Sequence, residues 1–403
     1  MVYIKRVVIS AVFFIVPGMV DAQWIHQNSG TDNGLFAISF LNANTGFVVG
    51  NFGTILRTTD GGTNWTAQIS GTMNSLMSVS FIDANTGIAV GLGGTILCTT
   101  NGGGNWDSQN GGVDCSLYGV AFTDPRAAGS SAENRTVVGD VGAILRTTDG
   151  GANWTLQNSW TTENLRGISF FAPNTGTAVG VGGTILRTIN GGTDWTIQIS
   201  GTTRCLWNST FSDANTGFTV GDTGTILRTT DGGMHWTIQT SGTIVNLKGV
   251  SFPNADTGFV VGDGGTILKT TNGGTNWISQ TSRTADDLFS VNFPVDVDTG
   301  YVVGDWGTIV KTTDGGAGTW VEEERKEGIS QKMGIGFWVI PNPFTSFATL
   351  PGHASECFVL YDVSGRRVGT YKGDRIGEGL RAGVYFIKAE KGDPKPIRIV
   401  KVR

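Results

Sequence analysis

The sequence predicts an all-β protein: a seven-bladed β-propeller of four-stranded blades, followed by a small C-terminal β-sandwich. One segment, Gly-x-x-Gly-Thr-Ile-Leu-Arg-Thr-Thr-Asp-Gly-Gly-x-x-Trp, recurs seven times with small changes, and its tryptophans are spaced by 41, 48, 41, 41, 41 and 43 residues. Each copy contains four short β-branched runs, separated by turns rich in Gly, Asn and Asp. A fixed period of this length is typical of small sheets arranged in a ring or a stack.

The chain begins with a predicted secretory signal peptide, residues 1–22. Lys5 and Arg6 precede an apolar run over residues 7–16, and small residues lead to Ala22. The apolar run is too short to span a bilayer, and no other segment is apolar enough to do so. We therefore assign the propeller to residues 23–320 and expect no transmembrane segment.

The second copy of the repeat illustrates one blade. Residues 76–81 form the first strand, residues 88–90 the second and residues 95–99 the third. A glycine-rich turn then leads to Trp106 and a polar outer strand. The ends of the ring leave two alternatives, because Trp24 lies 41 residues before Trp65 and resembles an eighth outer strand. Either this segment completes the last blade, or the segment around Trp320 does.

The turn of each repeat resembles the Asp-box, Ser/Thr-x-Asp-x-Gly-x-x-Trp, of sialidases, sortilin-like receptors and the photosystem II assembly/stability factor propellers. The resemblance to the last group covers residues 35–320. Asn replaces Asp in three copies, and both side chains accept hydrogen bonds from the amides of their own turn. We therefore interpret the box as structural, at Asp60, Trp65, Asn101, Trp106, Asp149, Trp154, Asn190, Trp195, Asp231, Trp236, Asn272, Trp277, Asp314 and Trp320.

The repeat disappears after Trp320. Residues 321–338 read as a charged linker, and residues 339–403 as a small β-sandwich. Pro-Asn-Pro-Phe at 341–344, Tyr-Asp-Val-Ser-Gly-Arg at 361–366 and Ala-Gly-Val-Tyr at 382–385 resemble the type A C-terminal sorting domain of the type IX secretion system. The resemblance implies export through the periplasm to the surface or medium of a Gram-negative bacterium, with the outer-membrane secretion machinery as partner. An Ig-like accessory domain is the alternative, and the sequence does not decide whether the tail is cleaved.

Charge and composition exclude several classes. Residues 23–320 carry 12 Lys and Arg against 22 Asp and Glu, which argues against nucleic acid as a partner. The four cysteines form no visible disulfide framework, so one bridge or free thiols both remain open. The three histidines show no metal-ligand spacing, and no phosphate-binding loop precedes a helix. We predict no metal site and no cofactor.

A cation recurs on the third strand of most repeats, and Cys98 stands in its place in the second. We expect these cations to pack between blades and pair with neighbouring carboxylates, with a basic docking band as the alternative. They are Arg57, Arg146, Arg187, Arg228, Lys269 and Lys311.

We expect functional residues at the positions where the seven repeats differ. One variable position follows the first leucine of each blade: Phe36, Met77, Tyr118, Arg166, Trp207, Lys248 and Phe289. The second set lies in the Gly-x-x-Gly turns: Phe52, Leu92, Asp140, Asp222, Asp263, Asp305 and Trp306. We expect both sets at one end of the ring, where their aromatic and charged side chains suit recognition of a protein or polysaccharide. The alternative is that they fill the channel or are simply solvated.

The favoured function is an exported, non-catalytic, monomeric propeller that binds a protein or polysaccharide through this aromatic-rich face. The alternative is a secreted glycan-active hydrolase or lyase of sialidase-like fold, with catalytic carboxylates among Asp140, Asp222, Asp263 and Asp305. A purely structural module is a third possibility.

Overall fold

We analysed a computed structural model of the chain. It describes residues 24–123 and 134–316, and in the C-terminal part residues 348–349, 357–362, 366–372, 375–376, 381, 383–389 and 397–401. The chain divides into two compact units at residues 321 and 322. The predicted signal peptide, the inserted loop of the third repeat, Trp320 and the linker lie outside the described residues.

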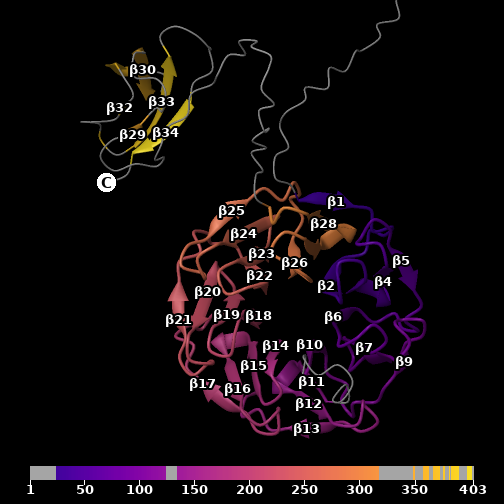
Figure 1. Ribbon diagram of the computed structural model, residues 1–403. Helices are drawn as coiled ribbons and strands as arrows, with labels where there is room; N and C mark the ends of the chain where they lie inside the picture. The colour runs from indigo at the N-terminus through magenta and orange to yellow at the C-terminus, as the bar shows by residue number, and fades with distance from the viewer. Residues whose placement is uncertain are drawn as a thin grey trace, which may run out of the picture. The chain divides into compact units, whose positions relative to one another are not determined.

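The first unit is a ring of seven antiparallel four-stranded sheets, as predicted (Figure 1). In each sheet the strands follow one another outward from the central channel. The first four blades are β2 (Leu35–Phe40), β3 (Gly46–Gly50), β4 (Ile55–Thr58) and β5 (Thr66–Gln68); β6 (Leu76–Phe81), β7 (Gly87–Gly91), β8 (Ile96–Thr99) and β9 (Asp107–Ser108); β10 (Leu117–Phe122), β11 (Arg135–Gly139), β12 (Ile144–Thr147) and β13 (Thr155–Gln157); β14 (Leu165–Ala172), β15 (Thr175–Gly180), β16 (Ile185–Thr188) and β17 (Thr196–Gln198).

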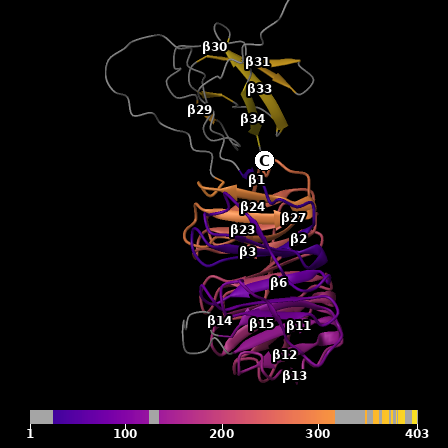
Figure 2. The ribbon, with the colours of Figure 1, turned by 90° about the vertical axis from the view of Figure 1, so that its right-hand side faces the viewer.

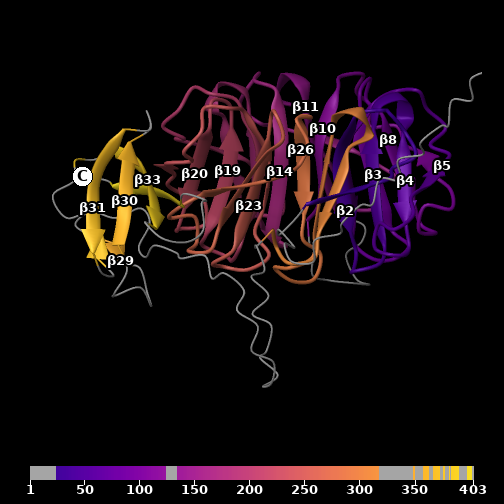
Figure 3. The same cartoon turned by 90° about the horizontal axis from the view of Figure 1, so that it is seen from above.

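Three further blades complete the ring. They are β18 (Leu206–Phe211), β19 (Gly217–Gly221), β20 (Thr225–Thr229) and β21 (Thr237–Gln239); β22 (Leu247–Ser251), β23 (Gly258–Gly262), β24 (Thr266–Thr270) and β25 (Ile278–Gln280); β26 (Leu288–Asn292), β27 (Gly300–Gly304), β28 (Ile309–Thr312) and β1 (Ile25–Gln27). Seen edge-on, the strands run across the thickness of the ring (Figure 2) (Figure 3). Four blades place a short 3-10 turn between their second and third strands: η1 (Asn51–Gly53), η2 (Asp140–Gly142), η3 (Val181–Gly183) and η4 (Asp305–Gly307).

The second strand of each blade is apolar because a neighbouring blade covers each of its faces. In β3, β7 and β19, for example, every residue is buried. Aromatic rings stack across four of these junctions. Phe47 of blade 1 stacks on Phe81 of blade 2 with centroids 3.9 Å apart, and Trp106 meets both rings edge-on. Such burial supplies the hydrophobic stabilisation that one isolated four-stranded meander lacks.

The N-terminal strand closes the ring, which decides between the two alternatives. β1 pairs antiparallel with β28, from Ile25 opposite Lys311 to Gln27 opposite Ile309. Trp24 is fully buried and meets Phe259 and Phe293 edge-on, as the box tryptophans of other blades meet their neighbours. Trp24 therefore fills, in blade 7, the place expected for Trp320.

The Asp-box acts as a turn, as its Asp/Asn exchange predicts. In blade 1, Thr58 Oγ1 donates to Asp60 Oδ1 over 2.9 Å, and the Asn64 amide donates to the same oxygen over 2.9 Å. In blade 2, Asn101 Oδ1 accepts the matching bonds from Thr99 Oγ1 and the Asn105 amide. The amide oxygen of Asn and the carboxylate of Asp are thus equivalent in this turn.

Four of the six repeated cations bond to a backbone carbonyl of the next blade, so our expectation of carboxylate partners was wrong for them. Arg146 Nε donates to the Gly191 carbonyl of the next blade's Asp-box over 2.7 Å, and Arg187 Nε donates to Gly232 over 2.6 Å. Lysines make the same bonds in blades 6 and 7. Lys269 Nζ donates to the Gly315 carbonyl, and Lys311 Nζ donates to the Gly61 carbonyl. The box carboxylates are already bonded within their own turns, so the carbonyl is the acceptor left for the cation.

Blade 2 lacks this cation, and blade 3 replaces it. Arg135 stands where the second strand of the other blades has a glycine, and the residue is 3% exposed. Its Nη1 donates to the Gly150 carbonyl over 2.8 Å and to Cys98 Sγ over 3.0 Å. The arginine that is absent from one strand is thus supplied by the neighbouring blade.

The second unit is also a β structure. A four-stranded antiparallel sheet has the order β31 (Arg367–Lys372), β30 (Cys357–Asp362), β33 (Gly383–Ala389) and β34 (Ile397–Lys401). A two-stranded sheet pairs β29 (Ala348–Thr349) with β32 (Arg375–Ile376). The cysteines, one of them in this unit, are all free.

Candidate functional site at the channel mouth

The seven variable residues of the first strands occupy one structural position. In every blade the register between first and second strand shifts after the first leucine, as between Leu35 and Ala37, so the following residue lies in a β-bulge. A bulge frees its residue from the ladder and re-aims the side chain. We call this set the channel girdle: Phe36, Met77, Tyr118, Arg166, Trp207, Lys248 and Phe289.

The channel girdle lines a cavity of about 380 Å³ at the mouth of the channel. This volume lies within the range of pockets that hold small ligands or single side chains. All seven girdle residues are half-buried. The structure thus brings together six of the eight predicted binding residues, with Met77 as the seventh member.

The two halves of the girdle differ in chemistry. Phe36 and Phe289, from adjacent blades, have ring centroids 5.4 Å apart, and Met77 continues this apolar side. On the other side cations and aromatic rings alternate. The Arg166 guanidinium lies 4.1 Å from the Tyr118 ring centre, and Lys248 Nζ lies 3.8 Å from that of Trp207. Cation–π contacts of this kind hold the charged groups in place while leaving their donors free.

Carboxylates stand at the rim of this cationic half. The Trp207 indole Nε1 donates to Asp222 Oδ1 over 2.6 Å. Asp263 accepts a 2.8 Å bond from Asn246, and its other oxygen lies 3.9 Å from Lys248 Nζ. These two carboxylates, which are catalytic candidates only under the alternative of a glycan-active enzyme, contact Trp207 and Lys248 of the girdle.

The variable turn residues lie at the same end of the ring, because each turn directly follows the strand residue that pairs with the first leucine. Phe52 in η1 and Trp306 in η4 are 62% and 75% exposed. Both have left-handed backbones, with φ of 54° and 55°, where three of the other five blades place glycine and two place Val141 and Thr223. Blade 7 packs directly on blade 1, so these two exposed rings belong to adjacent blades.

The remaining turn carboxylates differ in environment. Burial, and then the nearby Asp287, Asp286 and Asp263, raise the pKa of Asp305 above its ordinary value. Asp140 lies in η2 of blade 3, away from blade 7. Asp140, Asp222, Asp263 and Asp305 thus come from four different blades. Within the described residues, no group of His, Cys, Asp or Glu is arranged to hold a metal ion.

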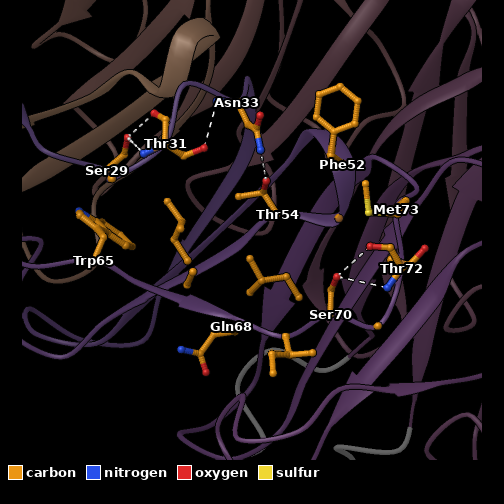
Figure 4. Close-up of a pocket in the computed structure, with 17 residues that line it drawn as sticks. Ser29, Thr31, Asn33, Phe52, Thr54, Trp65, Gln68, Ser70, Thr72 and Met73 are labelled. Atoms are coloured by element: carbon orange, nitrogen blue, oxygen red, sulfur yellow. Dashed lines mark hydrogen bonds between the residues drawn. The ribbon is translucent and has the colours of Figure 1, made fainter.

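A larger depression, of about 610 Å³, lies on the outer part of blade 1 (Figure 4). Loop residues 29–33, η1 and β5 line it, and their polar groups bond to one another. Asn33 Nδ2 donates to Thr54 Oγ1 over 2.9 Å, and Ser70 Oγ donates to the Thr72 carbonyl over 3.2 Å. A similar depression of about 470 Å³ recurs on blade 3, so this feature belongs to the blade architecture.

Sequence reasoning missed one exposed aromatic residue, Trp160, which is 71% exposed with φ of 58°. It stands in a Ser-x-Thr loop where four other copies have Ser-Gly-Thr, with left-handed glycines such as Gly71 and Gly201. A Cβ at those glycines would meet nothing within 4 Å. Comparing the loops between repeats, rather than the strands, could have found it.

Comparisons with known proteins support the same architecture. The sequence model of the family described as photosynthesis system II assembly factor YCF48 matches residues 16–162 and 193–282, more than half of the chain. The chain belongs to the YCF48 family. Comparison with curated protein sequences finds no match.

Two solved YCF48 structures resemble the chain in fold. One, described as YCF48 bound to D1 peptide, is 21% identical, with a TM-score of 0.61, and the match covers 74% of this chain and 99% of that one. The other, YCF48 from Cyanidioschyzon merolae, is 22% identical, with a TM-score of 0.61, and covers 72% and 99%. In the described part of this YCF48-family chain, no helix is long and apolar enough to cross a bilayer.

Proposed function

We propose that this chain is an exported, non-catalytic propeller that binds a protein partner through the channel-mouth face. The observation that carries the proposal is the girdle: seven bulges hold side chains of six kinds around one cavity, on a scaffold that otherwise repeats. A rigid ring that presents variable aromatic and charged groups is suited to recognition.

The family supports a protein as the partner. A solved YCF48 carries a bound D1 peptide, and the family is named for an assembly factor. Exposed Phe52 and Trp306 beside the cavity supply the apolar anchors that protein interfaces favour. Polysaccharide remains the competing ligand class.

Substitutions test this face. Trp306→Ala in the full-length protein should weaken retention on the partner captured from the surface of the producing bacterium, while Ile197→Ala on the outer strand β17 should not. Trp207→Ala should act like Trp306→Ala. Equal retention by all three variants would refute the proposal. Binding confined to a glycan array would replace the protein by a polysaccharide.

Export is proposed from the two ends of the chain. The tail motifs resemble a type IX sorting domain, and the signal peptide supplies the inner-membrane step that such a route requires. A chain truncated after residue 326 should stay in the periplasm. Secretion that persists without the tail would make the sorting-domain assignment wrong, and the mass of the secreted chain reports whether the tail is removed.

A glycan-active enzyme is the second candidate, favoured by the raised pKa of Asp305, since a general acid needs a protonated carboxyl. Asp305→Asn should then abolish turnover of a glycan substrate. The non-catalytic proposal expects no turnover in the unsubstituted chain. Product release that disappears in Asp305→Asn would decide for the enzyme.

A further inference from the structure

The cavity inside the channel girdle has an unbalanced lining. Of the described residues that line it, the charged ones are Arg166 and Lys248, both cations, from blades that flank Trp207. The carboxylates Asp222 and Asp263 stand at the rim, and Asp263 is 3.9 Å from Lys248 Nζ, longer than a hydrogen bond. Lys248 therefore forms a long ion pair with Asp263, whereas Arg166 has no carboxylate partner among the described residues.

Arg166 is the less satisfied of the two. Its Nε is buried and has no hydrogen-bond partner. The neighbouring thiol of Cys205 does not neutralise it, because burial raises the thiol pKa to about 11 and keeps it protonated. A buried, unpaired guanidinium donor is costly to leave unbonded. Arg166 thus lines the cavity with a positive charge that no carboxylate of the described chain balances by direct contact.

The opposite wall of the cavity is apolar and favours an apolar group on the ligand. Phe36, Met77 and Phe289 present rings and a thioether, and Phe36 and Phe289 pack against each other across the junction of blades 7 and 1. Below them, Ile38 and Val291 continue the apolar lining. A ligand that meets both walls must carry an anionic end and an apolar group.

We propose that the girdle cavity binds a carboxylate carried on an apolar group the size of an aromatic ring. The carboxylate lies between Arg166 and Lys248, and the apolar group packs on Phe36 and Phe289. The inference rests on the proposed binding role of this face and names the ligand chemistry of the cavity. A planar carboxylate matches the guanidinium fork. A phosphate dianion carries twice the charge of a carboxylate and would be repelled more strongly by Asp222 and Asp263.

The carboxylate can come from a free acid or from a chain end of the partner. Calorimetric titration of the full-length protein with N-acetylphenylalanine tests the shared chemistry, with N-acetylphenylalaninamide as the uncharged control. We expect the acid to bind about tenfold more tightly than the amide. A ten-residue peptide ending in phenylalanine, with a free or an amidated carboxyl end, separates the sources: binding of the free peptide selects a chain end, and binding of the small acid alone selects a free ligand.

Matched variants locate the site. Arg166→Gln and Lys248→Gln should each weaken acid binding about tenfold, whereas Arg283→Gln, an exposed cation on an outer loop, should not change it. Arg166→Lys keeps the charge and should bind more tightly than Arg166→Gln, which separates loss of charge from loss of folding.

Equal affinity for acid and amide, or unchanged binding in both glutamine variants, would overturn the proposal. Its failure is distinguishable from that of the proposed function. If the acid does not bind but partner retention still depends on Trp306, the face binds a protein and only the cavity assignment is wrong.

Discussion

The outer part of each blade and the channel girdle contrast sharply within one ring. At the Asp-box, side chains repeat and so do their bonds: Thr58 with Asp60 in blade 1 has the same geometry as Thr188 with Asn190 in blade 4. At the girdle the backbone repeats, with a bulge in every blade, but the side chains are of six kinds in seven blades. Repeated side chains therefore stabilise the ring, while a repeated backbone with different side chains provides the recognition surface.

The largest expected effect is the difference in stability between two tryptophan variants. Trp24→Ala removes a fully buried ring from the closing blade and should lower the free energy of unfolding by about 3–5 kcal/mol. Trp306→Ala removes an exposed ring and should change it by less than about 0.5 kcal/mol. Denaturant unfolding of both variants measures the difference. Similar losses in the two would break the contrast between scaffold and surface.

The next effect tests the substitute cation of blade 3. Arg135→Gly should destabilise the protein by about 2 kcal/mol, because the Gly150 carbonyl loses a partly buried, charge-assisted hydrogen bond. Cys98→Arg combined with Arg135→Gly rebuilds the arrangement of the other blades and should recover part of the loss. If the double variant is less stable than Arg135→Gly alone, the two residues do not compensate for each other.

Trp160→Gly should stabilise the fold by about 1 kcal/mol. Glycine adopts the left-handed backbone of this loop without strain, and the exposed indole gives up little burial. Thermal unfolding checks the sign. A destabilised variant would mean that Trp160 supports the ring instead of standing free on its surface.

The smallest expected effect is a loss of stability at acidic pH. Bonds from the Asn153 amide and side chain, and from Thr147, lower the pKa of Asp149 from 3.8 to about 2. A carboxyl with a lowered folded-state pKa stabilises the fold above pH 3.8, and this contribution disappears as the pH falls toward 2. Asp149→Asn keeps the accepting oxygen but cannot titrate, so its stability should change less between pH 4 and 2 than that of the unsubstituted protein. Parallel curves would contradict the assigned role.

The sequence predicted the blade number and the strand order because the period repeats the turn chemistry of each sheet. It did not decide closure, since Trp24 and Trp320 carry the same local signal and only the pairing of β1 with β28 distinguishes them. Our prediction of carboxylate partners for the cations was wrong, because the carboxylates of Asp60 and its equivalents accept hydrogen bonds from their own turns. The girdle residues were predicted as variable, but the bulge at Arg166 or Trp207 is a property of strand register, which a single strand does not reveal.

The most direct test of the central claim is a photo-cross-linking scan of the full-length protein on the producing cells. A benzophenone amino acid would replace Trp306 or Phe289 at the channel mouth and, as controls, exposed Ile197 or Ile238 on outer strands. The account predicts one discrete adduct from the channel-mouth positions and none from the outer strands. Adducts from the outer strands alone would contradict it.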